Sequence, residues 1–370
     1  MSLKERVLED LIKRRDNVLN GNINCIPSPF SRFRNDFIGI MQGCYYLISG
    51  SAKSGKTKLT NELFVYSPLL YAYNNRDKVR VKIFYYPLEE TKEEIITRYM
   101  SYLIYTLSNN QIRVSPTDLR STNENKILSD NVLEILKSEE CNNLLDWFEE
   151  NVIFGTAQNP TGIWHDMLNY AKLNGTVHYK NIETVDKTTG EVLTIKTFDY
   201  YEPVDPNEYV IIIVDHVSLI GLERGMTTRE TVNKLSEYMV ILRNKYNYIP
   251  VIVQQQNLET IGLEAFKANK IKPTLAGLGD SKYTARDCSM FLGLTNPYAY
   301  EIPKYAGYDI TKLKDNFRLL EVVLSRIGPS NGAIGLYFDG ATGYINELPS
   351  PEDNKNLERV YNYIKTIKNG

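Results

Sequence analysis

The sequence predicts an α/β protein in which a mostly parallel central sheet is flanked by helices. Short apolar runs alternate along the chain with longer segments of helical periodicity, the pattern of strand–helix–strand units. Some of these runs, such as 210–214, are apolar at every position, as strands covered on both faces are. The chain has 370 residues, of which 42% are hydrophobic, enough for one large domain with a sizeable core.

The first expected element is an amphipathic helix over residues 2–19. One apolar stripe runs along it, formed by Leu3, Val7, Leu11 and Ile12. The helix either packs within its own domain or serves as an arm that docks on a neighbouring subunit. Residues 20–42 contain Asn, Gly and Pro and predict a loop.

Strands and helices are then expected to alternate up to residue 173. In chain order they lie at 44–49, 59–73, 81–86, 92–107, 152–154 and 163–173. The stretch 108–150 is polar and irregular, with short helical patches. Residues 176–202 alternate polar and β-forming residues around a Lys-Thr-Thr-Gly turn, which predicts a β-hairpin. We therefore expect an insertion at about 108–204.

The second half continues the same alternation. Its expected elements lie at 210–214, 228–246, 250–253, 289–294, 319–325, 334–338 and 354–367. Residues 257–285 show weak periodicity and predict loops. The domain organisation is thus a helix and linker over 1–40, a main domain over 41–348, and a terminal helix over 349–370.

Composition excludes several classes of protein. Formal net charge is −2, which argues against bulk condensation of nucleic acid but allows binding in a local groove. No stretch approaches 18 uncharged apolar residues, and the N-terminus lacks the apolar core of a secretory signal, so we expect a cytoplasmic protein without membrane spans. The four cysteines are widely spaced, which favours buried thiols over a zinc site or disulfides.

The strongest chemical signal follows the first long strand. The pattern Gly-x-x-x-x-Gly-Lys-Ser/Thr is matched at every position by Gly50, Ser51, Ala52, Lys53, Ser54, Gly55, Lys56 and Thr57. A strand before it and a helix after it supply the required context. Backbone N–H groups in such a loop cradle phosphates. We therefore expect ATP as cofactor, with Lys56 at the β- and γ-phosphates and Thr57 as a ligand of Mg²⁺.

Two acidic segments complete the expected site. The apolar strand 210–214 ends in Asp215, which is expected beside the phosphate loop, holding the Mg²⁺ shell. His216, next in sequence, is either a packed histidine or a residue of the site. Glu89, after the strand 81–86, is placed to polarise the attacking water, although Glu90–Glu94 also resembles the acidic first turn of a helix.

In this order the motifs resemble the RecA-type ATPase core of DnaB-type replicative DNA helicases, including the helicase half of phage primase–helicases. The family's Ser-Leu-Glu-Met corresponds to Pro87-Leu88-Glu89-Glu90, so the resemblance implies Glu89 as catalytic glutamate. Its Asp-His-Ile-Ser corresponds to residues 215–218. Its Pro-Val strand with a terminal polar sensor corresponds to residues 250–256. The alignment favours Gln256 as γ-phosphate sensor, with Gln255 as the alternative.

The resemblance, which covers 22–105 and 205–348, also implies contacts in trans. The family's Lys-x-Arg-x-Gly-Pro appears with Leu324 in place of lysine and with Arg326 kept, so Arg326 is expected to reach the neighbouring subunit's ATP site. The DNA-binding loop Asp-Leu-Arg-Glu-Ser-Gly appears as 277–282, where the arginine is lost and Lys282 is gained. The expected DNA contacts are Arg224, Arg229, Lys267, Lys270 and Lys282, each of which also fits an ordinary surface residue.

Three functions remain open at this point. The first is an ATP-dependent helicase or translocase that moves on single-stranded DNA during replication, as a homo-oligomer expected to be a hexamer, with primase or a helicase loader as partner. The second is a RecA-type filament or recombination mediator that uses ATP as a switch. The third is an inactive ATP-binding scaffold. The Asp-His-x-Ser motif hints at a phage-encoded protein.

Overall fold

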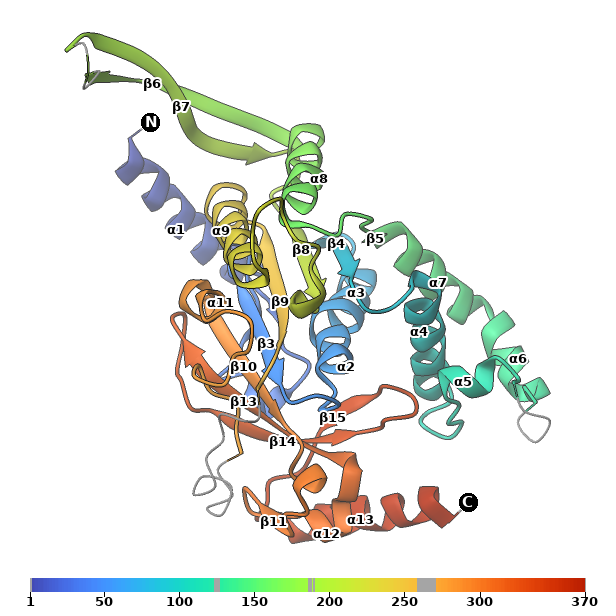
Figure 1. Cartoon of the computed structure of the whole chain (residues 1–370). Coiled ribbons are helices and arrows are strands. Elements are labelled where there is room, and N and C mark those ends of the chain that lie inside the picture. The colour runs from blue at the N-terminus through green and yellow to red at the C-terminus, as the bar shows by residue number, and fades with distance from the viewer. Residues whose placement is uncertain (1, 123–126, 186–187, 189, 258–270, 370) are drawn as a thin grey trace.

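A nine-stranded sheet forms the centre of the molecule (Figure 1). The computed structural model describes residues 2–122, 127–185, 188, 190–257 and 271–369. In spatial order the strands are β15 (Ile345–Glu347), β14 (Ala333–Phe338), β13 (Phe317–Ser325), β10 (Met290–Thr295), β3 (Tyr46–Gly50), β9 (Ile249–Gln255), β8 (Glu208–Asp215), β4 (Arg80–Pro87) and β5 (Val152–Phe154). The sheet is parallel from β10 to β5, and β13, β14 and β15 extend it in antiparallel fashion.

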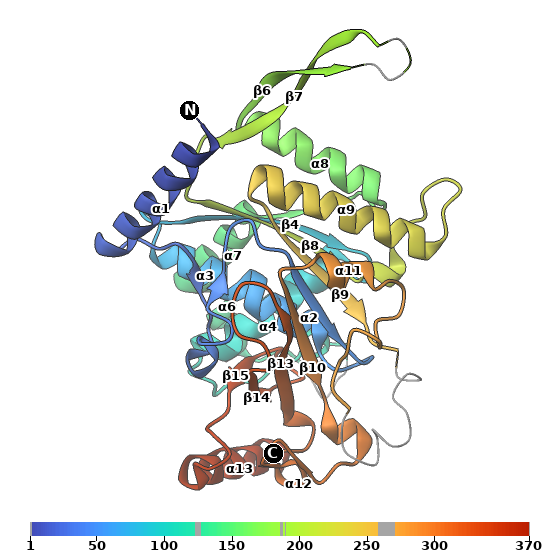
Figure 2. The ribbon, with the colours of Figure 1, turned by 90° about the vertical axis from the view of Figure 1, so that its left-hand side faces the viewer.

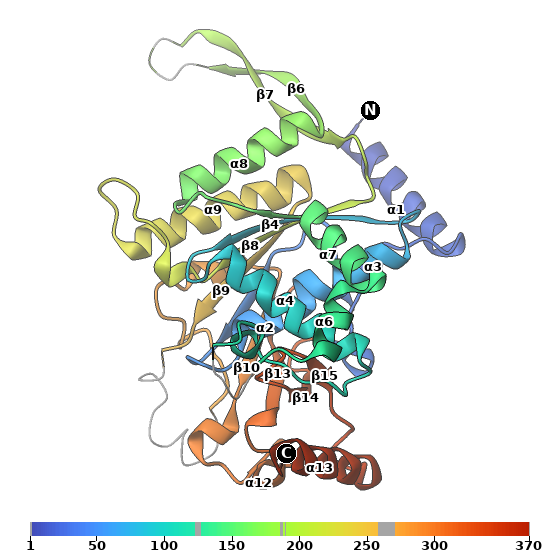
Figure 3. The same cartoon turned by 90° about the vertical axis from the view of Figure 1, so that its right-hand side faces the viewer.

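Helices cover both faces of the sheet (Figures 2 and 3). One face carries α2 (Lys56–Asn61), a π-helical turn (Glu62–Tyr66), α3 (Ser67–Asn74), α4 (Lys92–Leu107) and α7 (Glu139–Asn151). The other carries α8 (Pro160–Leu173), α9 (Thr228–Tyr246) and α11 (Tyr283–Asp287). Side chains alternate between the faces, as strand geometry requires: Tyr46 and Ile48 join the first core, and Tyr45 and Leu47 the second.

Parallel pairing brings the carboxyl ends of the central strands to one edge. Gly50 pairs with Gln255 on one side and with Leu294 on the other. Pro87 pairs with Asp215 at the ends of β4 and β8. The segments that leave β3, β4, β8 and β9 therefore start side by side, at the edge where ligands bind in open α/β sheets.

The remaining elements are short or lie at the periphery. They are α1 (Leu3–Leu19), β1 (Ile26–Pro27), β2 (Gly39–Ile40), α5 (Pro116–Leu119), α6 (Asp130–Lys137), β6 (Gly175–Val185), β7 (Val192–Pro203), β11 (Lys304–Tyr305), β12 (Tyr308–Asp309), α12 (Ile310–Leu313) and α13 (Asn354–Asn369). Helix α13 packs on a small core with α12 and β13 through Leu357, Tyr361 and Ile364. The predicted fold class is confirmed, while α7 is a full helix where only helical patches were expected.

Strands β6 and β7 form an antiparallel hairpin that projects from the body (Figure 1). Its base is held by Tyr201, whose hydroxyl donates to the carbonyl of Ala171 at 3.1 Å and whose ring packs against Tyr246. From the same 108–204 segment, β5 is an edge strand of the main sheet and α8 packs on the second core. The segment therefore contributes to the main body as well as projecting from it.

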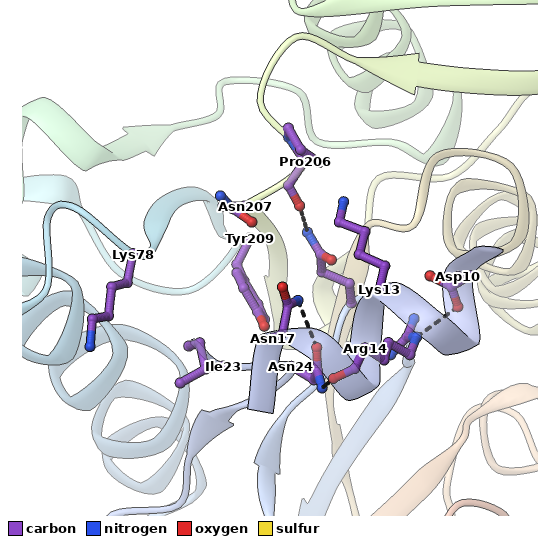
Figure 4. Close-up of a pocket in the computed structure, with 11 residues that line it drawn as sticks. Asp10, Lys13, Arg14, Asn17, Ile23, Asn24, Lys78, Pro206, Asn207 and Tyr209 are labelled. Carbon is purple, nitrogen blue, oxygen red and sulfur yellow. Dashed lines mark hydrogen bonds and ion pairs between the residues drawn. The ribbon is translucent and has the colours of Figure 1, made fainter. Parts of the chain in front are cut away.

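Helix α1 lies beside the base of the hairpin (Figure 2) and is attached mainly by polar contacts. Arg6 pairs with Asp199 of β7 at 3.5 Å. No residue of α1 is buried, and the apolar stripe is exposed, from 49% at Ile12 to 70% at Leu3. A cavity of about 50 Å³ separates α1 from the amino end of β8, near Tyr209 (Figure 4). The expected amphipathic helix is therefore present, with its apolar side facing outward.

Two further sequence expectations concern the described residues. No helix in the described ranges combines the length and the apolar character needed to cross a membrane. Cys44, Cys141 and Cys288 are buried free thiols, and Cys25 is a half-buried one. Burial raises the pKa of Cys25 and of Cys288 to about 12, so both remain protonated thiols.

Candidate nucleotide-binding and hydrolysis site

The loop from β3 to α2 is tightly packed where its glycines lie. Gly55 has φ +100°, and a Cβ added there would lie 2.8 Å from the Phe338 ring. A Cβ on Gly50 would lie 2.5 Å from the carbonyl oxygen of Leu294. Both glycines are therefore required by close approach, as in a loop whose backbone wraps around phosphate. Lys53 also has a left-handed backbone, with φ 57°.

Lys56 begins α2 and is 9% exposed. Its Nζ donates to the carbonyl of Ser51 at 3.0 Å, so the amine folds back over the loop. Burial lowers the pKa of Lys56, while the carboxylates of Asp215 and Glu89 act in the opposite direction. The loop thus holds a buried cation between two acidic residues.

Asp215 ends β8 and is 5% exposed. Neither of its carboxylate oxygens accepts a hydrogen bond from the described residues. Burial raises the pKa of Asp215 to about 6, against the effects of the nearby Thr57 hydroxyl and Lys56 amine. A buried carboxylate without donors is costly unless a cation joins it. Hydroxyl and carboxylate oxygens suit Mg²⁺, so Thr57 and Asp215 fit that ion.

Glu89 and Glu90 differ in their partners. Glu90 accepts a hydrogen bond from Arg98 Nη1 at 2.8 Å and forms an ion pair with that guanidinium. Glu89 has a side chain that is 60% exposed, with Oε2 3.4 Å from Nε2 of His216. Both follow β4, where the Leu88 N–H donates to the Asp215 carbonyl at 2.8 Å. Of the two carboxylates, Glu89 is the one not engaged by Arg98.

His216 is joined to Asp215 by a cis peptide bond. Its side chain is 14% exposed, and its Nδ1 is buried without a hydrogen-bond partner among the described residues. Burial lowers the pKa of His216, and the charges of Glu89 and Asp280 raise it. Of the two interpretations of the sequence, the contact with Glu89 places His216 at the site.

These groups surround one cavity of about 610 Å³, a volume typical of ligand sites. It is lined by Ala52, Lys53, Gly55, Lys56, Thr57, Lys58, Glu89, Glu90, Arg98, Asp215, His216, Gln255, Asp315, Arg318, Phe338 and Gly340. Ser54 lies beneath it, fully buried. The structure thus brings the phosphate loop, Glu89 and Asp215 together from three strand ends.

The two glutamines at the end of β9 face different ways. Gln255 lines the cavity. Gln256 is 6% exposed; its Nε2 donates to the Ser49 hydroxyl at 3.0 Å and its Oε1 accepts from the Thr274 N–H at 3.2 Å. The family alignment favoured Gln256 as sensor, but its side chain is not among the cavity-lining groups, so the alternative, Gln255, has the better placement.

Arg326 lies outside this cavity. Its side chain is exposed and donates from Nη2 to the carbonyl of Arg286 at 2.6 Å. A role in its own subunit's site is therefore not supported by this arrangement, whereas the trans role implied by the family resemblance needs such exposure.

The expected DNA contacts lie on loops that follow β8 and β9. Arg224 and Arg229 are exposed before and at the start of α9, and Lys282 is exposed just before α11. Lys267 and Lys270 fall outside the described residues. Both loops leave the sheet at the same edge as the nucleotide cavity.

Arg318 and Phe338 are cavity residues that the sequence analysis did not identify. Arg318 is 2% exposed, donates from Nε to the Ser54 carbonyl at 2.6 Å, and lies 4.1 Å from the centre of the Phe338 ring. Burial lowers its pKa. An arginine inside the apolar run 317–323 was the available signal, because a buried cation needs a structural or ligand-binding reason.

Comparison with solved structures agrees with this architecture. The ATPase domain of a phage helicase aligns over 94% of this chain and 99% of that domain, with a TM-score of 0.62 and 15% identity. A DnaB-like replicative helicase, described with its interactions with primase, aligns over 94% of this chain and 66% of its own, with a TM-score of 0.59 and 15% identity.

The chain therefore has the fold of a DnaB-type RecA-like core, which confirms the predicted resemblance at the level of fold. At this identity the likeness establishes the fold and not the activity. No protein-family model matches the sequence, and no curated protein matches it.

Proposed function

We propose that this protein is an ATP-dependent DNA translocase of the DnaB helicase type, acting on single-stranded DNA in replication. The observation that carries the proposal is the cavity in which Lys56, Asp215 and Glu89 meet at the ends of β3, β8 and β4. A binding module needs the first two residues only. The additional carboxylate, not engaged by Arg98, is what hydrolysis requires.

The residues divide the chemistry between them. Lys56 and the N–H groups of the phosphate loop hold the phosphates, and Lys56 offsets their negative charge. Thr57 and Asp215 hold Mg²⁺, which supplies charge neutralisation at the β- and γ-oxygens when bound. Glu89 orients and deprotonates the attacking water, and Gln255 contacts the γ-phosphate. Arg318 and Phe338 close the end of the cavity nearest Gly55.

Activity requires an oligomer in this proposal. Arg326 is exposed and remote from its own cavity, so it acts in the site of a neighbouring subunit. The apolar stripe of α1 is exposed along its length, a surface that a docked neighbour would cover. We propose a hexameric ring with ATP at each interface, and primase or a loader as further partner. The protein would act in the cytoplasm, phage-encoded if the Asp-His-x-Ser motif reflects its origin.

DNA is proposed to bind through the loops after β8 and β9, at Arg224, Arg229 and Lys282, together with Lys267 and Lys270. The second candidate function, an ATP-switched recombination filament, shares this core. The Arg-x-Gly-Pro segment at Arg326 favours the helicase. Micrographs with ATP and single-stranded DNA distinguish closed rings from filaments.

The deciding experiment is ATP hydrolysis with and without single-stranded DNA, in the wild type and in Glu89→Gln. We expect DNA to stimulate the wild type, and the substitution to lower kcat by about 10²- to 10⁴-fold while ATP still binds, because the general base alone is removed. Glu90→Gln is the matched control, since Glu90 is paired with Arg98.

Two outcomes would contradict the proposal. Hydrolysis that does not respond to DNA favours the filament or the scaffold, and hydrolysis that survives Glu89→Gln means that another carboxylate is catalytic. Unwinding of a forked duplex then tests the helicase itself.

A further inference from the structure

One short hydrogen bond joins the segment after β8 to the loop after β9. The hydroxyl of Ser218 donates to Oδ2 of Asp280 at 2.5 Å. Ser218 lies two residues after His216, and Asp280 lies two residues before Lys282. The bond therefore connects the segment that carries His216 with the loop that carries a proposed DNA contact.

The proposed catalytic carboxylate depends on this segment for its orientation. Oε2 of Glu89 lies 3.4 Å from Nε2 of His216. The Glu89 side chain is 60% exposed, so packing restrains it little, whereas the His216 side chain is 14% exposed and held in place. A shift of His216 would therefore redirect the Glu89 carboxylate.

Both ends of the connection are structurally firm. On one side, His216 and Ser218 are bracketed by a single 3₁₀ turn, in which the Leu219 N–H donates to the His216 carbonyl at 3.1 Å. On the other side, the Gly279 N–H donates to the Gln255 carbonyl at 3.3 Å. Neither Ser218 nor Asp280 lines the nucleotide cavity. They touch the reaction only through other residues.

We propose that Ser218 and Asp280 are positioning residues that couple DNA binding to ATP hydrolysis. DNA on the 277–282 loop moves Asp280, Ser218 follows through the hydrogen bond, and His216 then sets the Glu89 carboxylate for its work on water. The proposal rests on the proposed function, since it takes Glu89 as catalytic and this loop as a DNA contact.

The test compares ATPase rates without DNA and with saturating oligothymidylate, in the wild type, Ser218→Ala, Asp280→Ala and the double variant. We expect kcat without DNA and KM for ATP to stay near wild type, and kcat with DNA to fall by about tenfold, within the usual range of coupling between sites. The double variant should lose no more than either single one, because both remove the same bond. Ser218→Thr, which keeps a hydroxyl, should restore stimulation.

Ser281→Ala is the matched control. It removes a bond of similar length in the same loop, from Ser281 Oγ to Asn233 Oδ1 of α9 at 2.6 Å, which does not lead to His216. Full stimulation in Ser218→Ala or Asp280→Ala overturns the inference, as does an equal loss in Ser281→Ala, which would indicate general disturbance of the loop. A wild type that DNA does not stimulate overturns the proposed function itself.

Discussion

Two adjacent glutamines at the end of β9 make opposite predictions. Gln255→Ala removes a side chain from the cavity wall and should lower kcat for ATP hydrolysis, with the free energy of unfolding nearly unchanged. Gln256→Ala leaves the buried Ser49 hydroxyl and Thr274 N–H without their partner, and should cost about 1–3 kcal/mol of stability.

Denaturant unfolding and steady-state ATPase rates measure the two effects separately. A stable Gln256→Ala variant that has lost hydrolysis, beside an active Gln255→Ala variant, would return the sensor role to Gln256. Family alignment alone could not decide this pair, because a shift of one residue along a strand turns the side chain to the opposite face.

Single residues also mark the limit of prediction from sequence. The phosphate loop was identifiable because its glycines answer a local steric need, visible in the contacts of Gly50 and Gly55. Arg318 and Phe338 were not, because they come from strands far along the chain and meet the loop only once the sheet is assembled. Partners of this kind carry no local spacing that a sequence could show.

At the scale of elements, the π-helical turn Glu62–Tyr66 buries an acidic residue. Glu62 is 5% exposed, its Oε2 has no hydrogen-bond partner among the described residues, and burial raises its pKa to about 8. The unfolded chain releases this proton near the ordinary value of 4.5. Between pH 4.5 and 8 the folded state therefore binds more protons than the unfolded state, so this residue makes stability fall as pH rises through that window.

Replacing the carboxyl group should remove this pH dependence. We expect Glu62→Gln to be as stable as the wild type near pH 4.5 and more stable at pH 8, by up to about 5 kcal/mol, with the difference levelling off above pH 8. Urea unfolding across this range measures it. Glu93→Gln, at an exposed position of α4, is the control and should follow the wild type. Parallel curves for Glu62→Gln and the wild type would mean that Glu62 titrates normally in the folded protein.

The elements themselves were largely predictable, for physical reasons that differ between segments. The parallel strands were clear because a strand covered on both faces must be apolar throughout, as 210–214 is. Helix α7 was missed because its exposed face is polar and only residues such as Leu144 and Phe148 reach the core. The hairpin β6–β7 was found from its turn and alternation, but its projection into solvent follows from packing that alternation does not encode.

At the scale of the whole molecule, the nucleotide cavity and the proposed DNA loops share one sheet edge, while α1 and the hairpin lie toward the other end of the strands (Figure 1). This separation suits a ring in which α1 holds neighbours together without covering the cavity. It also means that Arg326 contributes only when subunits are arranged head to tail, so that each one completes the next.

Mixing two inactive variants tests this arrangement. Lys56→Ala removes phosphate binding within a subunit, and Arg326→Ala removes the contribution to its neighbour, so each alone should be nearly inactive. In rings assembled from an equal mixture, about one quarter of the sites combine an intact Lys56 with a neighbour's intact Arg326. We therefore expect up to about a quarter of the wild-type ATPase rate to return after dissociation and joint reassembly.

The control mixture combines Lys56→Ala with Glu89→Gln. Both residues serve the site of their own subunit, so every site in the mixed ring lacks one of them and no activity should return. Recovery in this control would mean that Glu89 acts across the interface. Absence of recovery with Arg326→Ala, in mixtures shown by mass measurement to have exchanged subunits, would remove Arg326 from the neighbouring site and leave the exposed arginine near Arg286 with a local structural role.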